Sequence, residues 1–357
     1  MGQLRGKLLP PALAIVFSML LCGVALIISG ANPLSAFGAM ISQVGKGTTT
    51  VDIINSTGIY YIAALAVAIG FQMNLFNIGV EGQYRVAAVV AAVVGGSIAL
   101  PPGLHTLVII IVGALAGAAW AAIPAILKVT RGVNEVISTI MMNGLAIGFS
   151  AYLIRRDVFG ELRGNNIRTP EIPSSGWMPG ISFGGSGTMF GFLFVAIALG
   201  VGYWVMMNRT RFGFELRASG ESSTAASAGG VNAKKMVLVS MLLSGAIAGL
   251  IGLPEMLGRD HTFSLNFTAG IGFSGIAIAL LGRNHPGGIA FGALLWSFLD
   301  KSGLALDNVG VPREIVTIMQ GSIVLSVVVA YEVVRRFELA AEQRRVGREL
   351  GTVGGAA

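Results

Sequence analysis

The sequence predicts an all-α membrane protein, a polytopic bundle of about ten transmembrane helices with broken or re-entrant segments. Three observations support this prediction. Hydrophobic residues make up 54% of the 357 residues and charged residues only 11%, whereas roughly a quarter of the residues in soluble domains are charged. The apolar residues fall in runs of about 20, the length that crosses a bilayer as a helix. The chain also holds 51 glycines, and small residues let helices approach closely in lipid.

Apolar runs bounded by Pro, Gly and charged residues predict ten spans in order along the chain. The first, 9–30, follows basic residues as in a signal peptide, but its apolar core of about 20 residues lacks a small-residue cleavage site, so we expect a retained span. The other nine lie near 53–71, 79–100, 104–127, 133–154, 189–207, 236–256, 267–282, 287–303 and 314–334. Residues 1–334 are therefore expected to form a single transmembrane domain, followed by a basic cytoplasmic tail at 335–357.

The 24 Lys and Arg residues set the expected orientation. With the N-terminus inside, 15 of them fall in inner segments, eight in outer segments, and one, Arg85, within a span. Because Lys and Arg are retained on the cytoplasmic side, we expect both termini to be cytoplasmic. The net charge of +7 then follows from topology, and nucleic acid is not an expected partner.

Two long connections interrupt the apolar runs. The outer one, 155–188, contains three prolines with Gly and Ser, and is expected to be a structured or mobile loop that faces away from the cytosol. The inner one, 208–235, places a charged helical stretch (214–221) before small polar residues (222–228). This composition favours a short helix outside the bilayer that docks a soluble partner.

The chain carries no motif for enzymatic chemistry. It has no GxxxxGK[ST] loop, no HExxH and no Cys or His spacing that holds a metal. A GxGxxG match at 270–275 lies inside an apolar run, where close helix packing by glycine explains it better than dinucleotide binding. We therefore expect a protein that is not an enzyme and that binds no cofactor itself. If transport is driven by ATP, another subunit must supply the nucleotide site.

A polar segment, 71–85, separates the second and third apolar runs. Its amide and carboxylate side chains are Gln72, Asn74, Asn77, Glu81 and Gln83. Polar groups are costly at membrane depth and usually face a protein interior or a watery path, and a helix broken at glycine frees backbone groups for a polar solute. These five residues are candidate substrate-pathway residues. The alternative is an ordinary cytoplasmic loop in which Glu81 and Arg85, four residues apart, form a helical ion pair.

A second polar cluster begins the fifth apolar run. It contains Asn134, Glu135, Ser138, Thr139 and Asn143. Positions 135, 139 and 143 share a helical face, so Asn143 is a further candidate for the substrate pathway. For Glu135 an equally supported alternative is that it is only a carboxylate in the first turn of a helix, where the helix dipole favours a negative charge.

Three motifs occur in order along the chain: FNIGVEGQ at 76–83, RAxGE at 217–221 with small residues after it, and GFSGIAIALLGRN at 272–284. Together they resemble the membrane permease subunit of bacterial ABC importers, in the branch that imports nucleosides with basic-membrane-lipoprotein-type binding proteins. Ribose and other simple-sugar permeases belong to the larger grouping and tend to carry a Gly-Gly-x-Asp-Leu-Ser type segment at the first motif. That difference favours a nucleoside substrate, which amide side chains can hydrogen-bond.

The resemblance implies that the inner loop seats in a cleft of a cytoplasmic ABC ATPase. The residues that match the family's coupling element are Arg211, Gly213, Arg217, Ala218, Gly220 and Glu221. The chain departs from the family at Ser222 and Ser223, where Asn and Pro are frequent.

The resemblance also implies the rest of the assembly. A second permease, frequently a different chain, shares the pathway, an extracytoplasmic lipoprotein selects the substrate, and ATP with Mg binds the ATPase subunit. The expected protein is thus a multi-pass permease in the bacterial plasma membrane that works by alternating access. A simple-sugar importer is the nearest alternative, and an ion-coupled secondary transporter that uses Glu81 or Glu135 is a second.

Overall fold

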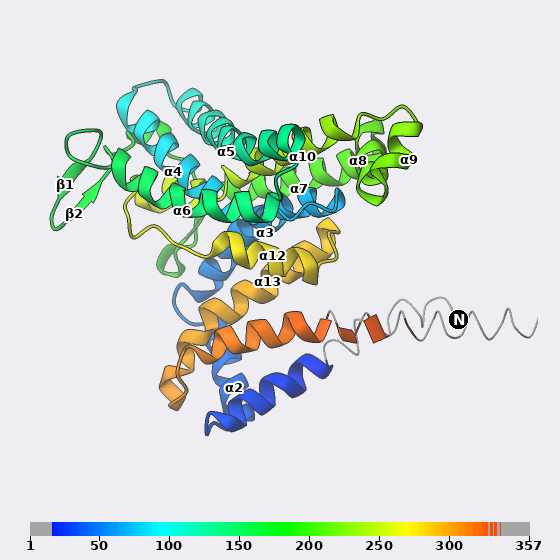
Figure 1. Ribbon diagram of the computed structural model, residues 1–357. Helices are drawn as coiled ribbons and strands as arrows, with labels where there is room; N and C mark the ends of the chain where they lie inside the picture. Colours follow the sequence, from blue (N-terminus) through cyan, green and yellow to red (C-terminus); the bar gives the residue numbers. More distant parts are fainter. Residues whose placement is uncertain (1–15, 328, 331, 334–335, 337–357) are drawn as a thin grey trace, which may run out of the picture. The chain divides into compact units, whose positions relative to one another are not determined.

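The computed structural model describes residues 16–327, 329–330, 332–333 and 336 (Figure 1). The chain divides into two compact units, Gly45–Lys301 and the paired chain ends Met1–Val44 with Ser302–Ala357. The start of the first predicted span and nearly all of the predicted tail at 335–357 lie outside the described residues.

The larger unit is almost entirely helical. Its helices are α3 (Thr49–Gln72), α4 (Val80–Ser97), α5 (Leu104–Arg131), α6 (Glu135–Leu153), α7 (Phe192–Arg209), α8 (Arg211–Glu221), α9 (Ser223–Ala228), α10 (Ala233–Ala248), α11 (Leu253–Glu255), the π-helix η3 (Met256–Asp260), α12 (Ile271–Leu281) and α13 (Pro286–Ser302). The core forms around α3, whose residues 62–69 are all apolar and fully buried, as expected for a helix surrounded by others, and which packs against α7, α10 and α12.

Side-chain caps define where several of these helices begin. Asn134 accepts hydrogen bonds from the backbone N–H groups of α6, Thr210 from α8, Ser222 from α9 and Asn232 from α10. Each cap satisfies a donor that the first helical turn leaves without a partner. At the other end of α5, Gly132 adopts the left-handed conformation that closes a helix (φ +68°).

Two GxxxG pairs join α5 to α10. A Cβ atom at Gly117 would overlap the carbonyl oxygen of Gly245 and lie 2.9 Å from the Cα of Gly249, and one at Gly249 would overlap the carbonyl of Gly113. The two backbones touch because none of these positions has a side chain, which is the packing that glycine spacing predicts for helices in lipid.

The smaller unit contains a sharp bend between two helices. An apolar helix, Val16–Ile28, and α2 (Pro33–Val44) meet at 110°. Gly30 in the connection has a φ of +81°, and proline at the first position of α2 suits a helix start. The pair has the geometry of a broken span or a re-entrant loop. The described part of the unit also contains the short helices η4 (Gly303–Ala305) and η5 (Asp307–Val309) and the apolar helix Ile315–Val327.

Five described helices are long and apolar enough to cross a membrane: α3, α5, α6, α7 and the stretch Ala233–Asp260 that runs from α10 through η3; the bent pair makes six. The chain is therefore a multi-pass membrane protein, whereas a count of about ten spans is not confirmed. The run predicted at 267–282 shows why, since α12 has 11 residues and extends about 16 Å, half of a hydrocarbon core of about 30 Å.

The connection 155–188 is folded. Strands β1 (Glu161–Arg163) and β2 (Asn166–Arg168) form one antiparallel hairpin, and β3 (Ile181–Ser182) and β4 (Thr188–Met189) form another. The short helices η1 (Ser174–Gly176) and η2 (Gly184–Ser186) lie between them. The segment is tied to the chain after η3, because Thr169 donates to the Phe263 carbonyl and Ile172 to the His261 carbonyl, both at 2.9 Å.

Candidate functional site: a polar break and an adjoining helix pair

The polar segment predicted at 71–85 contains the connection between α3 and α4. The helix α3 ends at Gln72, and Asn74 takes the left-handed conformation (φ +53°), which asparagine tolerates and which terminates helices. The N–H groups of Met73 and Leu75 both bond to the Gly70 carbonyl at 2.9 Å, so the end of α3 has its backbone acceptor satisfied. We call residues 73–79, together with the side chains that fasten them, the polar break.

A buried amide pair fastens the polar break. Asn77 donates to Gln83 Oε1 at 3.0 Å, and Gln83 returns a hydrogen bond to Asn77 Oδ1 at 2.9 Å. Asn77 also donates to Ser244 Oγ of α10 at 2.8 Å, and Ser244 donates to the Ala66 carbonyl of α3 at 2.6 Å. Each amide residue is 1% exposed. Sequence reasoning missed Ser244, although Ser240 and Ser244, one turn apart in an apolar run, were a signal for an inward polar stripe.

Asn143 fastens the same region from α6. Its Nδ2 donates to the Ile78 carbonyl at 3.0 Å, and its Oδ1 accepts from the Gly82 N–H at 2.8 Å. A Cβ atom at Gly82 would lie 3.0 Å from the Cα of Asn143, so the glycine allows α4 and α6 to approach. Asn143 thus joins Asn77 and Gln83 around the polar break.

Glu81 links α4 to the start of α12. The carboxylate is 8% exposed and accepts from the N–H of Gly270 at 2.7 Å and of Gly272 at 2.9 Å. The hydroxyl of Tyr84 lies 3.1 Å from Glu81 Oε1 and 2.5 Å from the Thr268 carbonyl. A negative charge at a helix N-terminus is favourable. The predicted alternative, an ion pair with Arg85, does not occur among the described residues.

The glycines of the 270–275 motif pack helices, as predicted. A Cβ atom at Gly272 would lie 2.5 Å from the Glu81 nitrogen, and one at Gly275 would lie 2.9 Å from the Ala63 carbonyl carbon. Glycine at these two positions lets α12 approach both α4 and α3.

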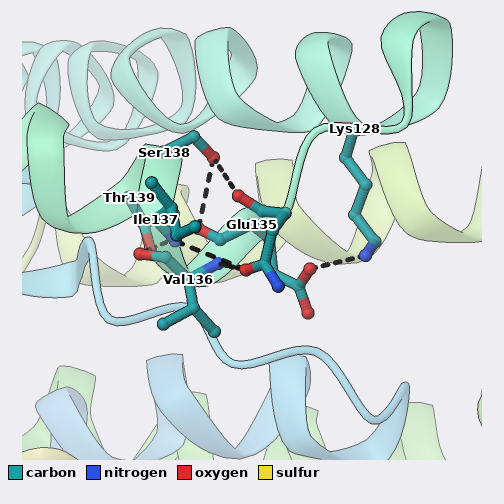
Figure 2. A network of polar contacts seen from close by, with 7 residues as sticks. Lys128, Glu135, Val136, Ile137, Ser138 and Thr139 are labelled. Atoms are coloured by element: carbon teal, nitrogen blue, oxygen red, sulfur yellow. Dashed lines mark hydrogen bonds and ion pairs between the residues drawn. The ribbon is translucent and has the colours of Figure 1, made fainter.

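Glu135 takes part in a separate network at the start of α6 (Figure 2). Its carboxylate pairs with Lys128 of α5 at 2.5 Å, and its side chain is 11% exposed. The hydroxyls of Ser138 and Thr139 donate to the Glu135 carbonyl, and Asn134 caps the helix. The geometry is that of a first-turn carboxylate with a neighbouring cation, the alternative that the sequence left open.

The α8–α9 pair presents one face to the helical core. Gly213 approaches α7 so closely that a Cβ atom would lie 2.6 Å from the Cα of Met207. Arg217 donates from its guanidinium to the Met207 carbonyl. Leu216 is fully buried and Ser219 is 4% exposed. Two of the residues that match the family's coupling element, Gly213 and Arg217, therefore brace α8 rather than face outward.

The inner face of α8 also contacts the polar break. Asn74 donates to the Gly220 carbonyl at 2.6 Å, and a Cβ atom at Gly220 would lie 2.7 Å from the Gln72 carbonyl oxygen and 2.9 Å from the Cα of Met73. Gln72 reaches Tyr203 of α7 at 3.3 Å. Two of the predicted pathway residues, Gln72 and Asn74, thus lie beside the predicted coupling residues.

The opposite face of the α8–α9 pair is exposed. The side chain of Arg211 is 89% exposed and pairs with Glu215 at 2.5 Å. Phe214 is 64% exposed and Glu221 is exposed, while Ala218 is partly covered. The sequence did not single out Phe214, although an aromatic residue in a charged, short helix is a signal for a contact surface.

The apolar helices define a multi-pass membrane protein. Residues 49–328 match the family described as branched-chain amino acid transport system / permease component, and the chain belongs to this family. It is 34% identical to the guanosine ABC transporter permease protein of Bacillus subtilis over 91% of this chain and 94% of the relative. It is 32% identical to the nucleoside ABC transporter permease protein of Lactococcus lactis over 93% of each. It is 31% identical to the glucose ABC transporter permease protein of Haloferax volcanii over 95% and 91%.

Proposed function

We propose that the chain is the permease subunit of an ABC importer that carries nucleosides across the plasma membrane by alternating access. It catalyses no reaction itself. A separate cytoplasmic ATPase binds ATP and Mg, a second permease of different sequence completes the pathway, and an extracytoplasmic lipoprotein delivers the substrate. Both termini are cytoplasmic, and about ten membrane segments, some of them half-length, form the domain.

One observation carries the proposal: the α8–α9 pair has an exposed outer face and an inner face bonded to the polar break. The outer face combines an exposed aromatic, Phe214, with the charged residues Arg211 and Glu221, a composition that suits contact with a protein partner. The inner face reaches α3 through the Asn74–Gly220 hydrogen bond. A partner that moves α8 therefore acts directly on a break at the end of a transmembrane helix.

The contacts inside the protein give this motion a route. From Gly220 it passes to Asn74 and the end of α3, and the amide pair connects the break to α10. Glu81, four residues beyond Asn77, holds the start of α12. Displacement of α8 thus reaches the half-helix α12 through short hydrogen bonds and packed helices, the kind of contiguous element that carries a rigid-body transition.

Nucleosides are the proposed substrate because two relatives that align over nine-tenths of the chain are named for guanosine and for nucleosides. A simple-sugar importer is the second candidate, since a relative of nearly equal identity is named for glucose. Competition by unlabelled inosine and unlabelled ribose against labelled guanosine uptake separates the two. Inosine should compete and ribose should not.

An ion-coupled secondary transporter would need a membrane carboxylate that exchanges a proton or sodium ion. Glu81 accepts two backbone hydrogen bonds and Glu135 pairs with Lys128. Both carboxylates therefore already have partners within the protein, which supports the ATP-driven proposal over an ion-coupled one.

The test is reconstitution of the permease pair, the ATPase and the binding protein in vesicles. The complex should take up labelled guanosine only when ATP and Mg reach the ATPase. Uptake by the permease alone, or uptake that an ionophore abolishes and ATP depletion leaves intact, would overturn the proposal.

A further inference from the structure

A polar cavity of about 350 Å³ lies at the end of the π-helix η3. Six of the residues that line it are Arg168, Glu255, Arg259, Asp260, Asn266 and Thr268. We call this cavity the outer pocket. The stretch Ala233–Asp260 begins at α10, directly after the α8–α9 pair, and ends at the outer pocket. Figure 1 shows the β1–β2 hairpin and the α8–α9 pair at opposite ends of the unit.

The helical side of the outer pocket has an unusual backbone. A π-helix occupies Met256–Asp260, a conformation found in well under 1% of residues and often at functional sites. Arg259 pairs with Glu255 and lies 2.9 Å from the Asp260 carboxylate. These ion pairs connect three of the charged side chains that line the cavity.

The other side of the outer pocket is formed by Arg168 and by residues of the segment 262–268, which backbone pairing brings together although they are far apart in the sequence. Arg168 pairs with Ser264 in an isolated antiparallel bridge, and Phe263 donates to Thr169 Oγ1 at 2.9 Å. The Nε–H of Arg168 is buried and has no hydrogen-bond partner among the described residues. A buried donor without a partner is costly, so an oxygen acceptor that reached this side chain from the pocket would be favoured.

The chemistry of the lining selects a neutral solute. The two arginines are balanced by two carboxylates, which leaves no excess positive charge for a phosphate group. Asn266 and the hydroxyls of Thr262 and Thr268 add neutral donors and acceptors. The volume lies at the lower end of the roughly 300–1,000 Å³ typical of small-molecule sites, a size that suits a nucleoside.

We propose that the outer pocket receives the nucleoside before translocation, with Arg168 donating to an oxygen acceptor of the nucleoside. This inference rests on the proposed function and assigns the site at which the nucleoside enters the permease. Thr268, which lines the pocket, is close in the chain to the residues that Glu81 holds: the hydroxyl of Tyr84 donates to the Thr268 carbonyl, and the N–H of Gly270 donates to Glu81. Occupancy of the pocket is thereby connected to the polar break.

The experiment is photolabelling of the assembled complex with 8-azidoguanosine, without binding protein, followed by peptide mapping. We expect label in the segment 255–268. Excess guanosine should protect at least tenfold better than GMP, because the phosphate finds no unbalanced cation. The double variant Arg168→Gln/Asn266→Ala should lose at least fivefold in labelling. Leu265→Ala, an exposed neighbour on the same loop, and Arg163→Gln, an arginine of the same outer connection, should label like the wild type.

Two results would overturn the inference: label that is absent from 255–268, or label that the double variant leaves unchanged. Equal protection by GMP would overturn the selection of a neutral solute. Guanosine uptake by the same wild-type preparation separates this test from the proposed function. A complex that imports guanosine but shows no label in the pocket contradicts only the entry site, whereas a complex that imports no nucleoside contradicts the function itself.

Discussion

The polar break and the α8–α9 pair have similar polar composition but opposite surroundings. Asn77 and Gln83 of the polar break, and Glu81 beside it, are nearly inaccessible, and their hydrogen bonds are made to one another and to other helices. In the α8–α9 pair, Arg217 bonds inward while Glu221 is exposed. The first region is an internal brace, and the second is a surface with a braced inner side. Substitutions in the two regions should therefore damage different properties.

The largest effect on stability is expected for Glu81→Ala. The change leaves the N–H groups of Gly270 and Gly272 without an acceptor, at a cost of about 1–3 kcal/mol for each buried donor. We expect the purified permease to lose most of its thermal stability in a detergent melting experiment. Glu161→Ala, which removes an exposed carboxylate of β1, should shift the free energy of unfolding by less than about 0.5 kcal/mol. Equal melting temperatures for the two variants would contradict the conclusion that Glu81 stabilises the fold by linking α4 to the start of α12.

Asn77→Ala comes next, with an expected cost of about 1–3 kcal/mol, because Gln83 and Ser244 both lose a partner in the interior. The double variant Asn77→Ala/Gln83→Ala should cost less than the sum of the two single changes, since the amides act as a pair. Strictly additive losses of stability would show that the two side chains do not interact.

Gly220→Ala tests the join between the two regions. The added Cβ would meet the Gln72 carbonyl oxygen at 2.7 Å, and such overpacking costs about 1–3 kcal/mol. We expect α8 to be displaced from α3, with guanosine uptake reduced at least tenfold. Gly229→Ala is the matched control in the same inner loop, because a Cβ atom there approaches no neighbour closer than 3.4 Å. An equal fall of uptake in both variants would show that the loss does not arise from the contact between α8 and α3.

The smallest effect on stability belongs to the exposed face. Phe214→Ala and Glu221→Gln should each change the free energy of unfolding by less than about 0.5 kcal/mol. Both should weaken binding of the ATPase, with the aromatic residue contributing more. A pull-down titration of the ATPase against detergent-solubilised permease measures this. If the Phe214→Ala/Glu221→Gln double variant binds the ATPase with unchanged affinity, the outer face of the α8–α9 pair is not part of the contact with the ATPase.

The sequence predicted the elements better than their pairings. Apolar runs and the charges between them placed the helices, and the polar residues and glycines of 71–85 marked the connection between α3 and α4, because these properties are local. The contact between Glu81 and Gly270 joins residues 189 apart, and the sequence offers no local signal for it. The start of α12 depends on that contact and on Gly270 at φ +89°, so a full span was predicted where a half-helix exists.

The candidate site was predicted as a list of residue types and not as an arrangement. Asn77, Gln83 and Asn143 were chosen as polar residues at membrane depth, and they do come together, but through hydrogen bonds to one another and to the backbone. Direct contact of these side chains with substrate stays a prediction. The outer pocket was not predicted, because it depends on a π-helix at Met256–Asp260 and on a pairing of Arg168 with Ser264, neither of which has a sequence signature.

The central claim is that the α8–α9 pair acts on the polar break, and Asn74→Gly tests it most directly. Glycine keeps the left-handed backbone at this position (φ +53°) and removes only the amide that bonds to Gly220. The measurement is the number of guanosine molecules imported for each ATP hydrolysed by the reconstituted complex. We predict that the variant assembles and hydrolyses ATP but that this ratio falls at least fivefold. A ratio equal to that of the wild type would contradict the account.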